Sequence, residues 1–70
     1  GNTNITSELS NILYKKIEAD DFVFVKQIIE KYNLSYDMME KIIKYSSFYD
    51  KSQVSIFTEL KKKIKLYYTN

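Results

Sequence analysis

Residues 22–46 read FVFVKQIIEKYNLSYDMMEKIIKYS, and this stretch decides the fold. Its apolar residues recur every three or four positions on both sides of the central NLSYD, which is the spacing of one buried face on an α-helix. Asn33 tolerates the left-handed backbone conformation in which helices often end, and Ser35 is a good N-cap with Asp37 in the first turn. The stretch therefore predicts two helices joined by a very short connection.

The helical periodicity continues toward the N-terminus. It predicts a helix over residues 7–18, with Thr6 or Ser7 as its N-cap. Asp20 and Asp21 follow this helix, and they are suited to cap the next one and to lie in its first turn, where the helix dipole favours an acid. We therefore expect the first two helices to be joined at this acidic pair.

A last helix is predicted toward the C-terminus. The third helix should end near Tyr49 and Asp50, after which Asp50 or Ser52 should cap the fourth. The result is an all-α fold, a compact bundle of about four short helices. The expected buried faces comprise Leu9, Ile12, Leu13 and Ile17; Phe22, Val25, Ile28, Ile29 and Tyr32; Met39, Ile42, Ile43 and Ser46; and Ile56, Phe57, Leu60, Ile64 and Tyr67 or Tyr68.

Length and composition bound the domain organisation. Seventy residues and 8.4 kDa are enough for one helical domain over residues 1–70, with residues 1–6 as a flexible N-terminus. Gly1 in place of an initiator Met suggests a protease scar, so we expect a piece excised from a longer protein. No apolar run approaches the ~18 residues of a membrane span, which predicts a cytoplasmic protein without a membrane partner.

The residue types that are missing exclude most enzyme classes. The chain has no His, no Cys and no Pro, and its only Gly is Gly1, so imidazole-based catalysis, disulfides, Cys or His metal sites and Gly-rich phosphate loops are all excluded. Asp20 and Asp21 are about 100° apart on a helix, a poor geometry for a shared metal or an acid and base pair. We therefore predict no catalytic residue, metal or cofactor. A small enzyme would need a cleft with Asp, Lys or Tyr groups of strongly shifted pKa.

Positive charge is concentrated at the C-terminal end. Residues 1–50 carry six lysines against eight acids, whereas residues 51–70 carry five lysines against Glu59 alone. On the last helix a phosphate backbone could lie along these cations beside a stackable tyrosine ring. A solvated helix end and a surface for an acidic protein are the two alternatives. The predicted DNA-binding residues are Lys61, Lys62, Lys63, Lys65 and Tyr68.

Aromatic residues suggest a second kind of surface. Seven Tyr and four Phe are more rings than so small a core can bury. Exposed Tyr beside apolar residues is typical of protein interfaces, and simple packing at the edge of the core is the alternative. Tyr36, Tyr45 and Tyr49 lie off or at the edge of the apolar stripes, so they are the predicted protein-interface residues.

Residues 22–64 resemble a known family. A helix, the break NLSYD, a second helix and then Lys51 followed by Ile56, Leu60 and Ile64 at four-residue intervals are similar to the DnaD-type replication domain and to the C-terminal domain of RepA-type plasmid replication initiators. The family's tail motif has Tyr and Trp where this sequence has neither. The resemblance implies a non-enzymatic accessory domain in replication initiation that docks a partner such as a helicase loader and contacts DNA non-specifically through its basic last helix.

Two functions thus follow from the sequence. The first is the replication domain that the resemblance implies, with the lysines of residues 61–65 on DNA. The second is a protein-interaction or oligomerisation module without DNA binding, whose partner could be a second copy of the chain.

Overall fold

Four helices make up the computed structural model, which describes residues 7–69. The described residues contain no strand, so the predicted all-α fold of four helices is confirmed, while the expected flexible segment 1–6 and the cap residue Thr6 lie outside the described residues. No helix among residues 7–69 is long and apolar enough to cross a membrane. The helices are α1 (Ser7–Glu18), α2 (Phe22–Tyr32), α3 (Tyr36–Tyr45) and α4 (Val54–Thr69).

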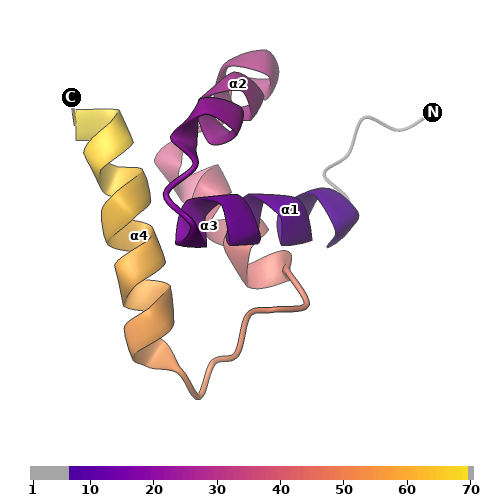
Figure 1. Ribbon diagram of the computed structural model, residues 1–70, viewed down its shortest axis with the longest axis vertical. Coiled ribbons are helices and arrows are strands. Elements are labelled where there is room, and N and C mark those ends of the chain that lie inside the picture. The colour runs from indigo at the N-terminus through magenta and orange to yellow at the C-terminus, as the bar shows by residue number, and fades with distance from the viewer. Residues whose placement is uncertain (1–6, 70) are drawn as a thin grey trace.

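Helix α1 is the centre of the arrangement. It contacts each of the other three helices, and α3 also packs against α4. In Figure 1, α1 runs across the direction of α4 instead of alongside it. The side chains that α1 buries, Ser10, Leu13, Tyr14 and Ile17, fall on one face of the helix. The single core therefore forms around α1.

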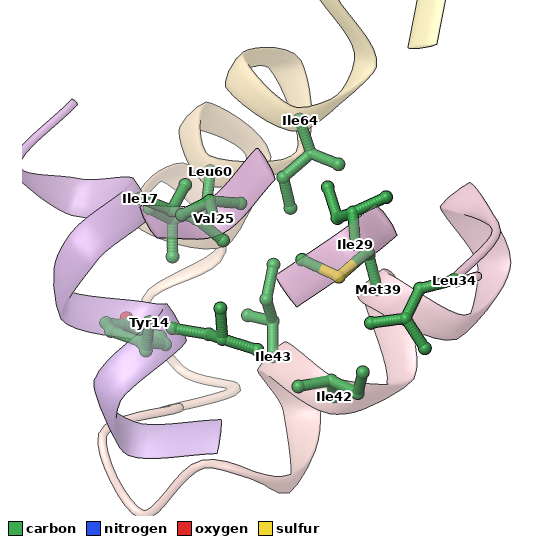
Figure 2. Packing of buried hydrophobic residues seen from close by; sticks show 11 residues of the cluster. Tyr14, Ile17, Val25, Ile29, Leu34, Met39, Ile42, Ile43, Leu60 and Ile64 are labelled. Atoms are coloured by element: carbon green, nitrogen blue, oxygen red, sulfur yellow. The ribbon is translucent and has the colours of Figure 1, made fainter. Parts of the chain in front are cut away.

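The core is built from aliphatic side chains of all four helices. Figure 2 shows Ile17, Val25 and Leu60 gathered on one side and Ile64 and Ile29 on the other. Burying each such side chain stabilises the fold by about 1.5–3 kcal/mol, so α4 is held through its inner face. The apolar side chains that are at most 2 % exposed are Leu13, Ile17, Val25, Met39, Ile43, Leu60 and Ile64.

The connection between α2 and α3 has the predicted chemistry. Asn33 adopts a left-handed conformation with φ 53°, and its N–H bonds to the carbonyl of Ile29, which ends α2. Ser35 is the N-cap of α3, because its hydroxyl accepts a hydrogen bond of 3.2 Å from the N–H of Met38. Both predictions at this connection are confirmed.

The connection between α1 and α2 differs from the prediction. Asp20 is left-handed, with φ 63°, and lies in the turn. Asp21 does occupy the N-cap position of α2, but its side chain makes no capping hydrogen bond. Its carboxylate instead pairs with Lys16 at 3.1 Å, five residues earlier. The ammonium group of Lys16 on α1 thus takes the carboxylate of Asp21 in place of the backbone N–H groups at the start of α2.

The predicted boundary between the last two helices is wrong. Helix α3 ends at Tyr45 and not near Tyr49, because the side chain of Asn11 draws the following residues out of the helix. The Oδ1 atom of Asn11 accepts hydrogen bonds from the hydroxyl of Ser46 and from the N–H and hydroxyl of Ser47, at 2.8–3.1 Å.

The predicted caps of α4 are also wrong. Helix α4 begins at Val54, beyond both Asp50 and Ser52. The Asp50 carboxylate accepts two hydrogen bonds from Ser52 and so closes a turn that precedes the helix. The same hydrogen bonds lower the pKa of Asp50 below its usual value.

Candidate functional site

Two of the four lysines predicted to bind DNA are tied to other helices. Lys61 pairs with Glu40 of α3 at 3.4 Å, and its Nζ lies 5.0 Å from the centre of the Phe57 ring. Lys63 pairs with Asp20 at 3.2 Å and donates a hydrogen bond of 3.1 Å to the carbonyl of Glu18 at the end of α1. Both side chains are half-buried, so their charges serve contacts within the chain.

The other two lysines are more exposed. Lys62 lies 4.0 Å from Glu59 on its own helix, a loose pair between two solvated side chains. Lys65 is in no ion pair among residues 7–69. The positive surface of α4 that remains for a phosphate chain is therefore narrow, and it centres on Lys62 and Lys65.

Tyr68, the predicted stacking residue, is half-buried and hydrogen-bonded. Its hydroxyl donates to the carbonyl of Leu34 at 2.7 Å, and its ring makes edge contacts with Tyr36 and Tyr67. Burial, with a smaller contribution from Tyr67, raises the pKa of Tyr68 to about 12. The ring thus joins the end of α4 to the connection between α2 and α3.

The three predicted interface tyrosines lie in different surroundings. Tyr36 is half-buried against Tyr68, and Tyr49 is half-buried against Phe57, with ring centres 5.2 Å apart. Tyr45 is 63 % exposed near the end of α3. Of these three residues, Tyr45 alone presents a largely free ring.

Tyr45 belongs to a groove between α1 and α3. Its lining residues are Ser10 from α1 and Met38, Lys41, Ile42 and Tyr45 from α3, and its volume is about 350 Å³. Met38 is 47 % exposed, so two large apolar side chains flank the buried Ile42 at solvent. We refer to these five residues as the α1–α3 groove. Exposed apolar groups of this size around a depression are typical of an interaction site.

Two polar groups of the α1–α3 groove have no partner within residues 7–69. The hydroxyl of Ser10 is fully buried and makes no hydrogen bond. Lys41 is exposed and is in no ion pair, in contrast to Lys61 of α4. A buried hydroxyl without a partner costs about 1–3 kcal/mol, which the fold must offset elsewhere.

A second apolar surface surrounds Leu66, which is 63 % exposed on α4. On one side a hollow of about 310 Å³ is lined by Leu66 with Asp20, Phe22, Lys63 and Tyr67. On the other side a hollow of about 370 Å³ is lined by Leu66 with Lys62, Lys65 and Thr69. Leu66 is thus a ridge between two shallow depressions, one of which already contains an internal ion pair.

The described residues contain no group of three or more side chains placed to hold a metal ion. Tyr14, Asp50 and Tyr68, whose pKa values are displaced from their usual values, do not line any of the three hollows. The pKa of Tyr14 is raised mainly by burial, with Glu18 and Asp50 adding to the effect.

Sequence reasoning missed Met38 and Lys41 as site residues. Met38, Lys41, Ile42 and Tyr45 recur at i, i+3, i+4 and i+7, so they form a second stripe on α3 beside the core-facing stripe that contains Met39. A search for two stripes on one short helix could have found them.

Comparisons with protein-family models, with curated proteins and with solved structures each return no match for this chain. The resemblance to DnaD-type domains therefore stays a prediction.

Proposed function

We propose that the chain is a non-enzymatic protein-docking domain that binds its partner in the α1–α3 groove. The observation that carries the proposal is the pair of exposed side chains Met38 and Tyr45 on either side of Ile42. Tyr is among the residues most enriched at interface hot spots, and Met adapts its shape to different partners.

The charges of the chain favour this function over DNA binding. Lys61 and Lys63 are held by Glu40 and Asp20, and a phosphate would have to displace those acids to be bound. The α1–α3 groove contains no such internal pair. Its cation is therefore available to a partner at no electrostatic cost to the fold.

Selection from a random library of helical peptides tests the proposal. Peptides enriched on the wild-type chain are counter-selected on the double variant Met38→Ser, Tyr45→Ser, whose changes are at exposed positions and should leave the fold intact. We expect peptides that bind the wild type and lose at least tenfold in affinity on the variant. Val23→Ser is the control, because Val23 is an exposed apolar residue outside the groove. Enriched peptides that bind the double variant and the wild type equally would refute the proposal, as would no enrichment.

DNA contact by an accessory domain of a replication initiator is the second candidate. Lys62, Lys65 and Thr69 line one hollow beside Leu66, and Lys65 is a cation without an ion pair among the described residues. A phosphate chain could follow this edge of α4, as the DnaD-type resemblance implies.

Fluorescence anisotropy of labelled duplex and single-stranded DNA at two salt concentrations tests this candidate. If it is right, Lys62→Ala with Lys65→Ala weakens DNA binding. The slope of the logarithm of affinity against the logarithm of salt concentration then falls by the amount expected for nearly two phosphate contacts. Lys26→Ala with Lys51→Ala removes the same charge elsewhere and is the control. Binding that is equal in the two double variants would contradict the candidate. Light scattering on the same samples reports whether the chain self-associates.

A further inference from the structure

We propose that the α1–α3 groove takes an acidic amphipathic helix, whose apolar side chains lie between Met38 and Tyr45 and whose carboxylate pairs with Lys41. This inference rests on the proposed docking function and names the chemistry of the partner. Two features of the groove support it: its length and its charge.

The length of the groove matches two turns of a helix. Met38 and Tyr45 are seven residues apart on α3, which separates them by about 10 Å along the axis. An incoming helix presents apolar side chains at i, i+3 or i+4 and i+7 over the same distance, which is the usual pattern of helix-in-groove recognition. A partner that adds a strand needs a sheet edge, and residues 7–69 contain no strand.

The charge of the groove is positive. Lys41 is the charged residue among the five that line the groove, and Asp37, one turn earlier on α3, forms no ion pair with it. Glu40, the other acid of α3, is engaged by Lys61. Lys44 reaches toward α4, where its Nζ lies 5.4 Å from the centre of the Phe57 ring. A carboxylate on the partner can therefore pair with Lys41 without displacing an ion pair within residues 7–69.

The same charge argues against a second copy of the chain as the occupant. A symmetric dimer that buries this groove against itself would bring two Lys41 side chains to one interface, where like charges repel. A separate helix with Glu or Asp on the rim of its apolar face has the opposite charge.

Fluorescence anisotropy with designed peptides tests the inference. The probe is a capped helical peptide of about 14 residues, roughly four turns, with Leu at i, i+4 and i+7 and Glu along both rims. A second peptide has Lys in place of every Glu, and a third keeps the composition of the first but scatters the Leu residues. We expect the acidic peptide to bind at least tenfold more tightly than either, and its affinity to fall as salt rises from about 0.05 to 0.5 M.

Substitutions in the chain locate the contact. Lys41→Gln should weaken the acidic peptide about five- to tenfold and remove most of its salt dependence, while Met38→Ala weakens it at all salt concentrations. Lys26→Gln is the matched control, since Lys26 is an exposed lysine of α2 outside the groove. Amide chemical shifts that move on binding should map to α1 and α3.

Three results would overturn the inference: equal binding of the acidic and basic peptides, unchanged affinity in Lys41→Gln, or a mass that rises with concentration and returns to monomer in Tyr45→Ser. If the selected library peptides depend on the groove but carry no acidic residues, the proposed docking function stands and the acidic partner is refuted. If the selected peptides bind independently of the groove, both proposals are refuted.

Discussion

The lysine-rich face of α4 and the α1–α3 groove are opposite in how their polar groups are used. On α4, Lys61 is held by Glu40 of α3 and Lys63 by Asp20 of the turn after α1, although the charge count along the chain singles out this region. In the groove, one lysine and one buried hydroxyl have no partner within residues 7–69. Lysines in a charge-rich region can thus serve to hold the helices together, whereas a single unpaired lysine elsewhere can be free to bind a partner.

The sharpest test of this contrast compares how much a substitution in each region changes the free energy of unfolding. Ile64→Ala removes a 1 % exposed side chain from the inner face of α4 and should lower the free energy of unfolding by about 2–5 kcal/mol, enough to unfold much of so small a domain. Tyr45→Ser in the groove should change it by less than about 0.5 kcal/mol. Urea unfolding followed by circular dichroism measures both. Similar losses in the two variants would mean that the groove is part of the framework.

The next largest effect is expected at the buried hydroxyl of the groove. Ser10→Ala removes a polar group without a partner among residues 7–69 and improves helix propensity, so the free energy of unfolding should rise by about 1–2 kcal/mol. Thermal and urea unfolding check this value, with exposed Ser55→Ala on α4 as the control for propensity alone. A loss of stability in Ser10→Ala would show that the hydroxyl is satisfied in solution.

The pH dependence of the free energy of unfolding tests the role of Tyr68 in holding α4 to the rest of the fold. Its folded pKa of about 12 lies above the ordinary value of 10.0, so its contribution is fully present below pH 10 and is lost as the pH rises toward 12. Tyr68→Phe should cost about 1 kcal/mol at pH 7, because the Leu34 carbonyl loses its donor. Urea midpoints from pH 8 to 12 should fall less steeply in this variant than in the wild type. Tyr45→Phe, at an exposed ring, controls for phenol removal, and parallel curves for wild type and Tyr68→Phe would contradict the assignment.

The smallest effect distinguishes the two halves of the lysine cluster. Lys61→Ala with Lys63→Ala removes two half-buried ion pairs and should cost about 1 kcal/mol, less at high salt, whereas Lys62→Ala with Lys65→Ala should be close to neutral. Unfolding at low and high salt compares the two double variants, which carry the same change in charge. Equal losses would place all four lysines on a solvated face.

The sequence predicted those parts of the fold that local chemistry controls. The bounds of α1, the end of α2 at Asn33 and the Ser35 cap all depend on residues within one or two turns, and the structure confirms them. The end of α3 depends on Asn11, which lies 35 residues from Ser46 in the chain. No local pattern contains that contact, so the boundary was misplaced.

The candidate site was predictable to a smaller extent. Tyr45 lies off the apolar stripes and is exposed as that position predicts, but Tyr36 and Tyr49 were chosen by the same rule and are half-buried against other rings. Whether a lysine is paired depends on how α4 crosses α1 and α3, and the spacing of lysines in the sequence carries no information about that crossing. The α1–α3 groove exists because two helices meet, so Ser10 could not be assigned to it from α1 alone.

The hydrogen bonds that Asn11 accepts from Ser46 and Ser47 also govern the rigidity of the groove. Asn11 follows Ser10 on one wall, and the two serines follow Tyr45 on the other. These hydrogen bonds therefore join the two walls at one end of the groove. The separation of the walls is therefore set when the chain folds, before any partner arrives. A partner helix meets a shape that already exists, and the ordering cost that slows and weakens binding to loose surfaces falls mainly on the partner.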